Sequence, residues 1–167
     1  MNFKHFIIAL PLLLGFTTVK SQTECTFKPD TVTIPKEKKT INAHYLQTTF
    51  KNNSNFFLYK SDNNKYYLKL IVTENLYFGK IDVLELKSSE KSYYAKDTKQ
   101  YQLDKNTGYY VIEIWKNYIG TLKDDGLTAI VFGKAETLYS KQDCSQVKQL
   151  AKCFYESIDI KKTKQKN

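Results

Sequence analysis

Histidine, the side chain best suited to act as a general base near neutral pH, is nearly missing from this sequence. The 167 residues include only two histidines, His5 and His44. His5 lies in a segment that we expect to be removed, so His44 would be the sole base for a Ser-His-Asp or Cys-His site. A lone histidine on a strand is usually a surface residue, and no G-x-S-x-G motif accompanies it. We therefore predict no catalytic residue of this class.

Carboxylate pairs are the second chemistry to consider. Glu74, Glu85, Glu113 and Glu136 lie on predicted strands or strand ends. Two of them facing each other across a cleft, with carboxyl groups about 5–10 Å apart, would suit a glycan or cell-wall hydrolase. Spacing along the chain does not reveal such convergence, so the hydrolase is an alternative hypothesis.

Metal and cofactor motifs are incomplete. The segment 104–108 resembles the start of a calcium loop, but Trp115 occupies the twelfth position, where a bidentate Glu is needed. A zinc site would need His44 together with cysteines that we expect to form a disulfide. The chain has no glycine-rich phosphate loop. The sequence predicts no metal site and no cofactor.

Tyrosine doublets are the most distinctive feature of the chain. Because successive strand residues point to opposite faces, each doublet should place one ring inside and one outside. If the outer rings lie side by side, they form a candidate aromatic binding face for a protein or glycan. The simpler interpretation is that the rings only cover the sheet. The doublets are Tyr66 and Tyr67, Tyr93 and Tyr94, and Tyr109 and Tyr110.

The chain is basic, with a formal charge of +9, and all 26 of its Lys and Arg residues are lysine. Arginine is the side chain that binds guanine and phosphate in a bidentate manner, so its absence argues against a nucleic-acid partner. An A- and T-rich coding bias also explains the abundance of lysine, asparagine and tyrosine. We expect only weak contact with anionic cell-surface polymers.

Residues 1–21 have the pattern of a signal peptide, with Lys4 before an apolar run at 6–16. The run is shorter than the about 20 residues that span a bilayer. Val19 and Ser21 form a small-residue cleavage box, so we expect cleavage after Ser21. This start resembles the export signals of Bacteroidetes-type Gram-negative bacteria. It predicts an exported protein, periplasmic or secreted, with no transmembrane span after cleavage; an uncleaved anchor is the alternative.

Cysteine usage agrees with export, because an oxidising compartment favours a disulfide among Cys25, Cys144 and Cys153. Cys144 and Cys153 fall nine residues apart in one predicted helix. That spacing separates them by about 13 Å along the axis, too far for a bond. Cys25 must then pair with one of them, and we predict Cys144, which is nearer the apolar stripe. Three reduced, packed cysteines are the alternative.

Two segments have helical periodicity. A short helix is expected near 116–124, with Gly126 as its left-handed cap. A longer amphipathic helix is expected near 141–158, with Ser140 and Asp143 at capping-box spacing. The apolar face predicted for the short helix comprises Trp115, Tyr118, Ile119 and Leu122.

The remaining segments alternate with period two, which predicts strands. The fold class is therefore α+β: an antiparallel sheet of about six to eight strands with the helices on one face. We expect a signal peptide at 1–21, one domain at 22–160 and a disordered lysine-rich tail at 161–167. The leading functional hypothesis is a small exported, non-enzymatic binding protein of unknown ligand. A periplasmic inhibitor or immunity protein is a further alternative, beside the hydrolase.

Overall fold

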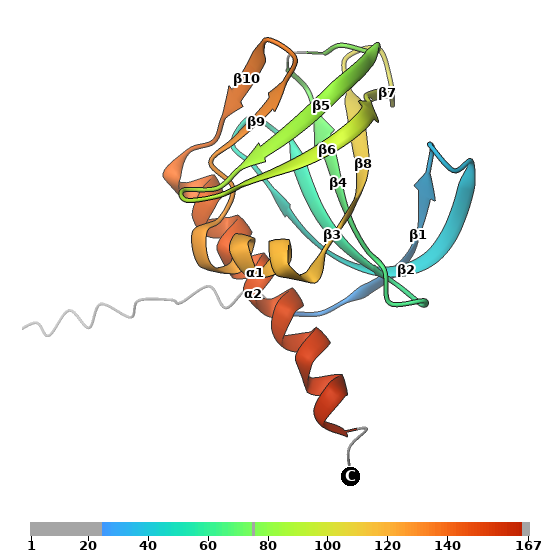
Figure 1. Ribbon diagram of the computed structural model, residues 1–167, viewed down its shortest axis with the longest axis vertical. Helices are drawn as coiled ribbons and strands as arrows, with labels where there is room; N and C mark the ends of the chain where they lie inside the picture. The colour runs from blue at the N-terminus through green and yellow to red at the C-terminus, as the bar shows by residue number, and fades with distance from the viewer. Residues whose placement is uncertain (1–24, 75, 165–167) are drawn as a thin grey trace, which may run out of the picture.

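The computed structural model describes residues 25–74 and 76–164. Ten strands and two helices occupy this part of the chain, and all strand pairs are antiparallel (Figure 1). The α+β class is confirmed, with the strands divided between a sheet of six and a sheet of four. The expected signal peptide at 1–21 lies outside the described residues.

The elements fall into three groups. In spatial order, the six-stranded sheet comprises β1 (Lys28–Ile34), β2 (Lys39–Thr49), β3 (Asn55–Ser61), β4 (Tyr66–Val72), β8 (Gly108–Ile114) and β7 (Tyr101–Gln102). The four-stranded sheet comprises β10 (Ala135–Leu138), β9 (Ala129–Phe132), β5 (Lys80–Lys87) and β6 (Ser92–Lys99). The helices are α1 (Lys116–Asp125) and α2 (Lys141–Lys164). No helix in these described segments is long and apolar enough to cross a membrane.

The main core lies where the two sheets and the two helices meet. Strand β4 contributes Leu68, Leu70 and Val72, all on one face, because alternate strand residues share a face. Helix α2 contributes the stripe that its sequence period predicts. The buried apolar residues of α2 are Val147, Leu150, Ala151, Phe154 and Ile158.

A second, smaller core lies on the other face of the six-stranded sheet. The β1–β2 hairpin bends away from the rest of the sheet (Figure 1). Its residues Val32, Ile34 and Ala43 pack with Tyr59 and Tyr67. The hairpin therefore buries part of a face that would otherwise be open to solvent.

Helix α1 buries Tyr118, Ile119 and Leu122, as predicted. Trp115 is the exception, because its side chain is 72% exposed. It precedes the helix with extended backbone angles, φ −96° and ψ 153°, so the helical period does not apply to it. At the other end, Gly126 has φ 75° and its N–H donates to the Leu122 carbonyl at 2.9 Å.

Helix α2 is longer than expected, since it ends at Lys164 rather than near residue 158. It includes residues 161–164, which the sequence assigned to a disordered tail. Residues 165–167 lie outside the described residues.

The disulfide joins Cys25 to Cys153, with a Cα–Cα distance of 5.4 Å. The predicted Cys25–Cys144 pair is therefore wrong, although the exclusion of a Cys144–Cys153 bond holds. Phe27 packs on Phe154 with ring centroids 5.4 Å apart, which brings the N-terminal segment beside this part of α2. Cys144 is free, and its Sγ lies 3.3 Å from the Asp125 carbonyl oxygen at the end of α1.

The predicted capping box at the start of α2 is present. The Asp143 N–H donates to Ser140 Oγ at 3.2 Å, and Ser140 N–H and Oγ donate to Asp143 Oδ2 at 3.1 and 2.6 Å. The Lys51 N–H donates to Asp143 Oδ1 at 3.1 Å. Burial raises the pKa of Asp143, but the hydrogen bonds from Ser140 and Lys51 outweigh it and hold the pKa below its usual value.

We expect Asp143→Asn to lower the free energy of unfolding by about 1–3 kcal/mol at neutral pH, because charged hydrogen bonds to a buried group are lost. The folded-state pKa is lowered, so this stabilisation is present above the unfolded-state pKa and disappears as the pH falls through the folded-state pKa. Urea denaturation of both proteins from pH 7 to pH 2.5 measures this. A difference that stays constant into acid would contradict the ionic origin.

Candidate functional site

Two of the tyrosine doublets divide their rings between the faces of the six-stranded sheet, as the strand period predicts. Tyr110 is fully buried in the main core, whereas Tyr109 lies half-buried on the opposite face. Tyr66 packs edge-on against Phe154 on the core side, and Tyr67 belongs to the second core. Tyr67 is only 2% exposed, because the β1–β2 hairpin covers it.

The third doublet lies on β6, at the edge of the four-stranded sheet. Tyr93 packs on Tyr118 with centroids 4.7 Å apart, and its hydroxyl donates to the Glu113 backbone oxygen at 2.8 Å. Tyr94 points away from the core and is 58% exposed. The outer rings of the doublets therefore do not form one flat, open face.

Instead, several tyrosines meet in a hollow of about 620 Å³ between the two sheets. We call this hollow the tyrosine groove. One wall is β6 from Tyr93 to Lys99, and β8 contributes residues 111–113. The turn between β1 and β2 forms a third side. The tyrosines that line the groove are Tyr67, Tyr93, Tyr94 and Tyr101.

The phenols of the groove are hydrogen-bond donors at neutral pH. Burial, followed by the negative charge of Glu113, raises the pKa of Tyr67. The same two causes raise the pKa of Tyr93. Both hydroxyls therefore keep their protons, next to a carboxylate that is itself bonded to Lys65 Nζ at 3.0 Å. The Tyr93 proton is already donated to the Glu113 backbone oxygen, so a ligand here would meet aromatic rings and an ion pair.

The rim of the groove is rich in lysine. Asp97 is bonded to Lys80 at 3.0 Å, and this bond, with smaller contributions from Lys36 and Lys96, lowers the Asp97 pKa. Lys99 lies over the ring of Tyr101, with Nζ 5.7 Å from the centroid. Because Glu37, Asp97 and Glu113 line the groove beside these lysines, a ligand would meet charges of both signs.

A row of aromatic rings on the outer face of the six-stranded sheet was missed by the sequence analysis. Tyr45 lies 5.7 Å from Phe57 and 5.4 Å from Tyr59, centroid to centroid. Lys69 Nζ sits over the rings of Phe57 and Tyr109, at 5.7 and 5.5 Å. The alternation of Phe57 and Tyr59 on one strand was the signal that could have revealed this row.

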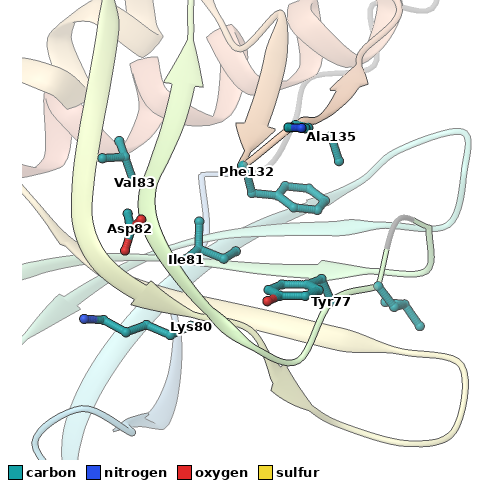
Figure 2. A pocket seen from close by; sticks show the side chains of 10 residues that line it. Tyr77, Lys80, Ile81, Asp82, Val83, Phe132 and Ala135 are labelled. Carbon is teal, nitrogen blue, oxygen red and sulfur yellow. The ribbon is translucent and has the colours of Figure 1, made fainter.

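A second hollow, of about 600 Å³, lies beside the turn between β9 and β10. We call it the apolar pocket. Figure 2 shows the rings of Tyr77 and Phe132 on opposite sides of it, with Ile81 nearby. Tyr77 precedes β5 in the chain, and Phe132 ends β9. The pocket is lined by Leu76, Tyr77, Lys80, Ile81, Asp82, Val83, Phe132, Gly133, Lys134 and Ala135.

A buried amide holds one wall of the apolar pocket. Gln100 is fully buried; its Oε1 accepts the Tyr77 N–H at 2.7 Å and its Nε2 donates to the Tyr110 hydroxyl at 2.8 Å. Gly108 leaves room for this side chain, because a Cβ there would lie 2.8 Å from the Gln100 amide carbon. The inner ring of one tyrosine doublet thus helps to position the pocket wall.

His44 lies in a third hollow, of about 360 Å³, which is also lined by Ser61, Asp62 and Ser157. Both serine hydroxyls are engaged elsewhere. Ser157 Oγ donates to the Phe154 carbonyl at 2.6 Å, and Ser61 Oγ bonds within its own turn, to Asn63 and Lys65. The hollow therefore does not present a serine activated by His44.

The four glutamates do not gather in one hollow. Glu113 lines the tyrosine groove. Glu85 on β5 and Glu136 on β10 are both register partners of Val131 on the strand between them. They therefore share a face of the four-stranded sheet, with their Cα atoms about 10 Å apart. Glu136 is bonded to Lys87 at 2.9 Å, and neither lines the groove or the apolar pocket. Within residues 25–74 and 76–164, no three or more His, Cys, Asp or Glu side chains are placed to hold a metal ion.

Neither a family model, nor a curated protein, nor a solved structure matches this chain.

Proposed function

We propose that this protein is an exported binding protein and that the tyrosine groove contacts its ligand, a segment of a protein or a glycan. The observation that carries the proposal is the meeting of Tyr67, Tyr93, Tyr94 and Tyr101 in one hollow. Tyrosine combines a large apolar ring with a polar hydroxyl and loses little conformational entropy on binding.

Export is supported by the disulfide between Cys25 and Cys153 together with the signal-peptide pattern at 1–21. Disulfides persist in oxidising compartments and are rare in the reducing cytosol. We prefer a binding role to the hydrolase hypothesis, because Glu113 lines the groove without Glu74, Glu85 or Glu136 beside it.

The test compares Tyr94→Ala and Tyr101→Ala with Trp115→Ala as a control. Trp115 is an aromatic residue that is 72% exposed, and it lines neither the groove nor the apolar pocket. Ligands are captured from envelope extracts and on a glycan array, and their affinities are then measured by calorimetry. We expect each groove variant to bind about 10–30-fold more weakly, as aromatic anchors of interfaces do, with an unchanged melting temperature.

Equal binding by the groove variants and by Trp115→Ala would show that the groove is not the contact surface. Failure to capture any ligand reproducibly would contradict the binding role itself.

A further inference from the structure

The apolar pocket has the size and lining of a small-molecule site. Its volume of about 600 Å³ falls within the range of ligand pockets. Apolar side chains form its walls, and the rings of Tyr77 and Phe132 face its interior from opposite sides (Figure 2). An alkyl chain or a flat apolar group would be contacted on both faces between these rings.

Exposed apolar surface is concentrated at this place. Tyr77 is 55% exposed, Phe78 37% and Val83 40%, and all three lie within seven consecutive residues. Contiguous apolar patches on a protein surface commonly mark binding sites. Tyr77 and Val83 are lining residues of the pocket, so this exposed apolar surface is continuous with the hollow.

The pocket is formed before any ligand arrives. Gln100 fixes the backbone of Tyr77, and the Tyr77 ring lies so close to Gly79 that a Cβ there would fall 2.5 Å from the ring. At the β9–β10 turn, Gly133 has φ 60° and nothing lies within 4 Å of its Cβ position, so the mouth stays open. Ordered walls reduce the entropy lost on binding.

The charged groups at the rim select the head of the ligand. Lys80 is bonded to Asp97 and points away from the two rings (Figure 2). Lys134 follows Gly133 at the mouth and has no ion-pair partner within the described segments. Asp82 is the acidic residue of the lining, and its negative charge lies near Lys80, where it helps to raise the Lys80 pKa. An anionic head at Lys134 gains an ion pair there, whereas a cationic head at Asp82 would compete with Lys80.

We propose that the apolar pocket binds a small amphiphile with an apolar chain and a carboxylate head, with the chain between Tyr77 and Phe132 and the head at Lys134. The site is separate from the tyrosine groove, and the proposal does not depend on the function assigned to that groove.

Decanoate is the probe, with decanol and decyltrimethylammonium as the neutral and cationic comparisons. Calorimetry should show saturable one-to-one binding of decanoate, weaker binding of decanol and the weakest binding of the cation. Amide chemical shifts should change at 76–83 and 132–135. Decanoate that does not saturate, that shifts the tyrosine groove instead, or that binds no better than the cation overturns the proposal.

Two variants test separately how the alkyl chain and the carboxylate head of the ligand contribute to binding. Ala135→Phe fills the pocket from a half-buried position on β10 and should abolish binding of decanoate and decanol alike. Lys134→Ala should lower the affinity for decanoate by about three- to fivefold, as expected for the loss of an exposed ion pair. The affinity for decanol should be unchanged.

Leu138→Ala, on the same strand and 74% exposed, is the control for the pocket-filling change. Lys105→Ala, at an exposed turn, is the control for the lost charge. Melting temperatures verify that every variant is folded. Decanoate affinity that is unaffected by both Ala135→Phe and Lys134→Ala would also overturn the assignment.

Discussion

Replacing Cys153 with serine should lower the free energy of unfolding by about 4–5 kcal/mol, whereas replacing Cys144 should change it by about 1 kcal/mol or less. The Cys25–Cys153 bond spans 128 residues, and in the chain-entropy model a loop of this length strongly restricts the unfolded chain. Cys144 contributes only a partly buried thiol and one weak hydrogen bond to Asp125. Guanidinium denaturation of the oxidised proteins measures both effects.

A reducing agent provides the internal control for this prediction. Reduction should bring the wild type down to the stability of the Cys153→Ser variant and leave that variant unchanged. A large loss of stability in Cys144→Ser, or a wild-type stability that does not change on reduction, would contradict the assigned pairing.

The second large effect is expected at Gly126, where α1 ends against α2. We expect Gly126→Ala to lower the free energy of unfolding by about 3–4 kcal/mol, from backbone strain and overpacking together. Its φ of 75° is unfavourable for alanine. The new methyl would also lie 2.5 Å from Cys144 Sγ and 2.7 Å from the Cys144 carbonyl oxygen. That oxygen belongs to the backbone of α2 and cannot swing aside.

Gly133→Ala separates the two causes. Gly133 also has a positive φ, of 60°, but its Cβ position is empty, so only the conformational cost of about 1–2 kcal/mol should appear. Thermal and chemical denaturation of both variants give the difference between them. If the two substitutions lower the free energy of unfolding equally, the close approach of α1 and α2 at Gly126 adds nothing to the cost of Gly126→Ala.

Local pattern was sufficient to predict most elements of this fold. The Ser140–Asp143 capping box, the buried stripe of α2 and the alternation in β4 all depend on neighbours within a few residues. Trp115 shows the limit of that approach: the helical period placed it on the buried face, but the helix begins one residue later and the Trp115 side chain is exposed.

Long-range arrangement could not be predicted from the same patterns. Alternation shows which residues share a face, but not that β5 and β6 form a second sheet with β9 and β10, in which β5 pairs with β9. Helix geometry excluded one disulfide, yet the choice between Cys144 and Cys153 depended on where Phe27 packs. For the candidate site, the doublets were recognised, but the covering of Tyr67 by the β1–β2 hairpin was not.

Gln100 lies between the tyrosine groove and the apolar pocket. Its chain neighbours Lys99 and Tyr101 line the groove, while its side chain anchors the Tyr77 backbone at the pocket. A ligand of one hollow that displaced this amide would change the free energy of binding at the other. Such a coupling is reciprocal: the change that the first ligand causes in the binding free energy of the second equals the change that the second causes for the first.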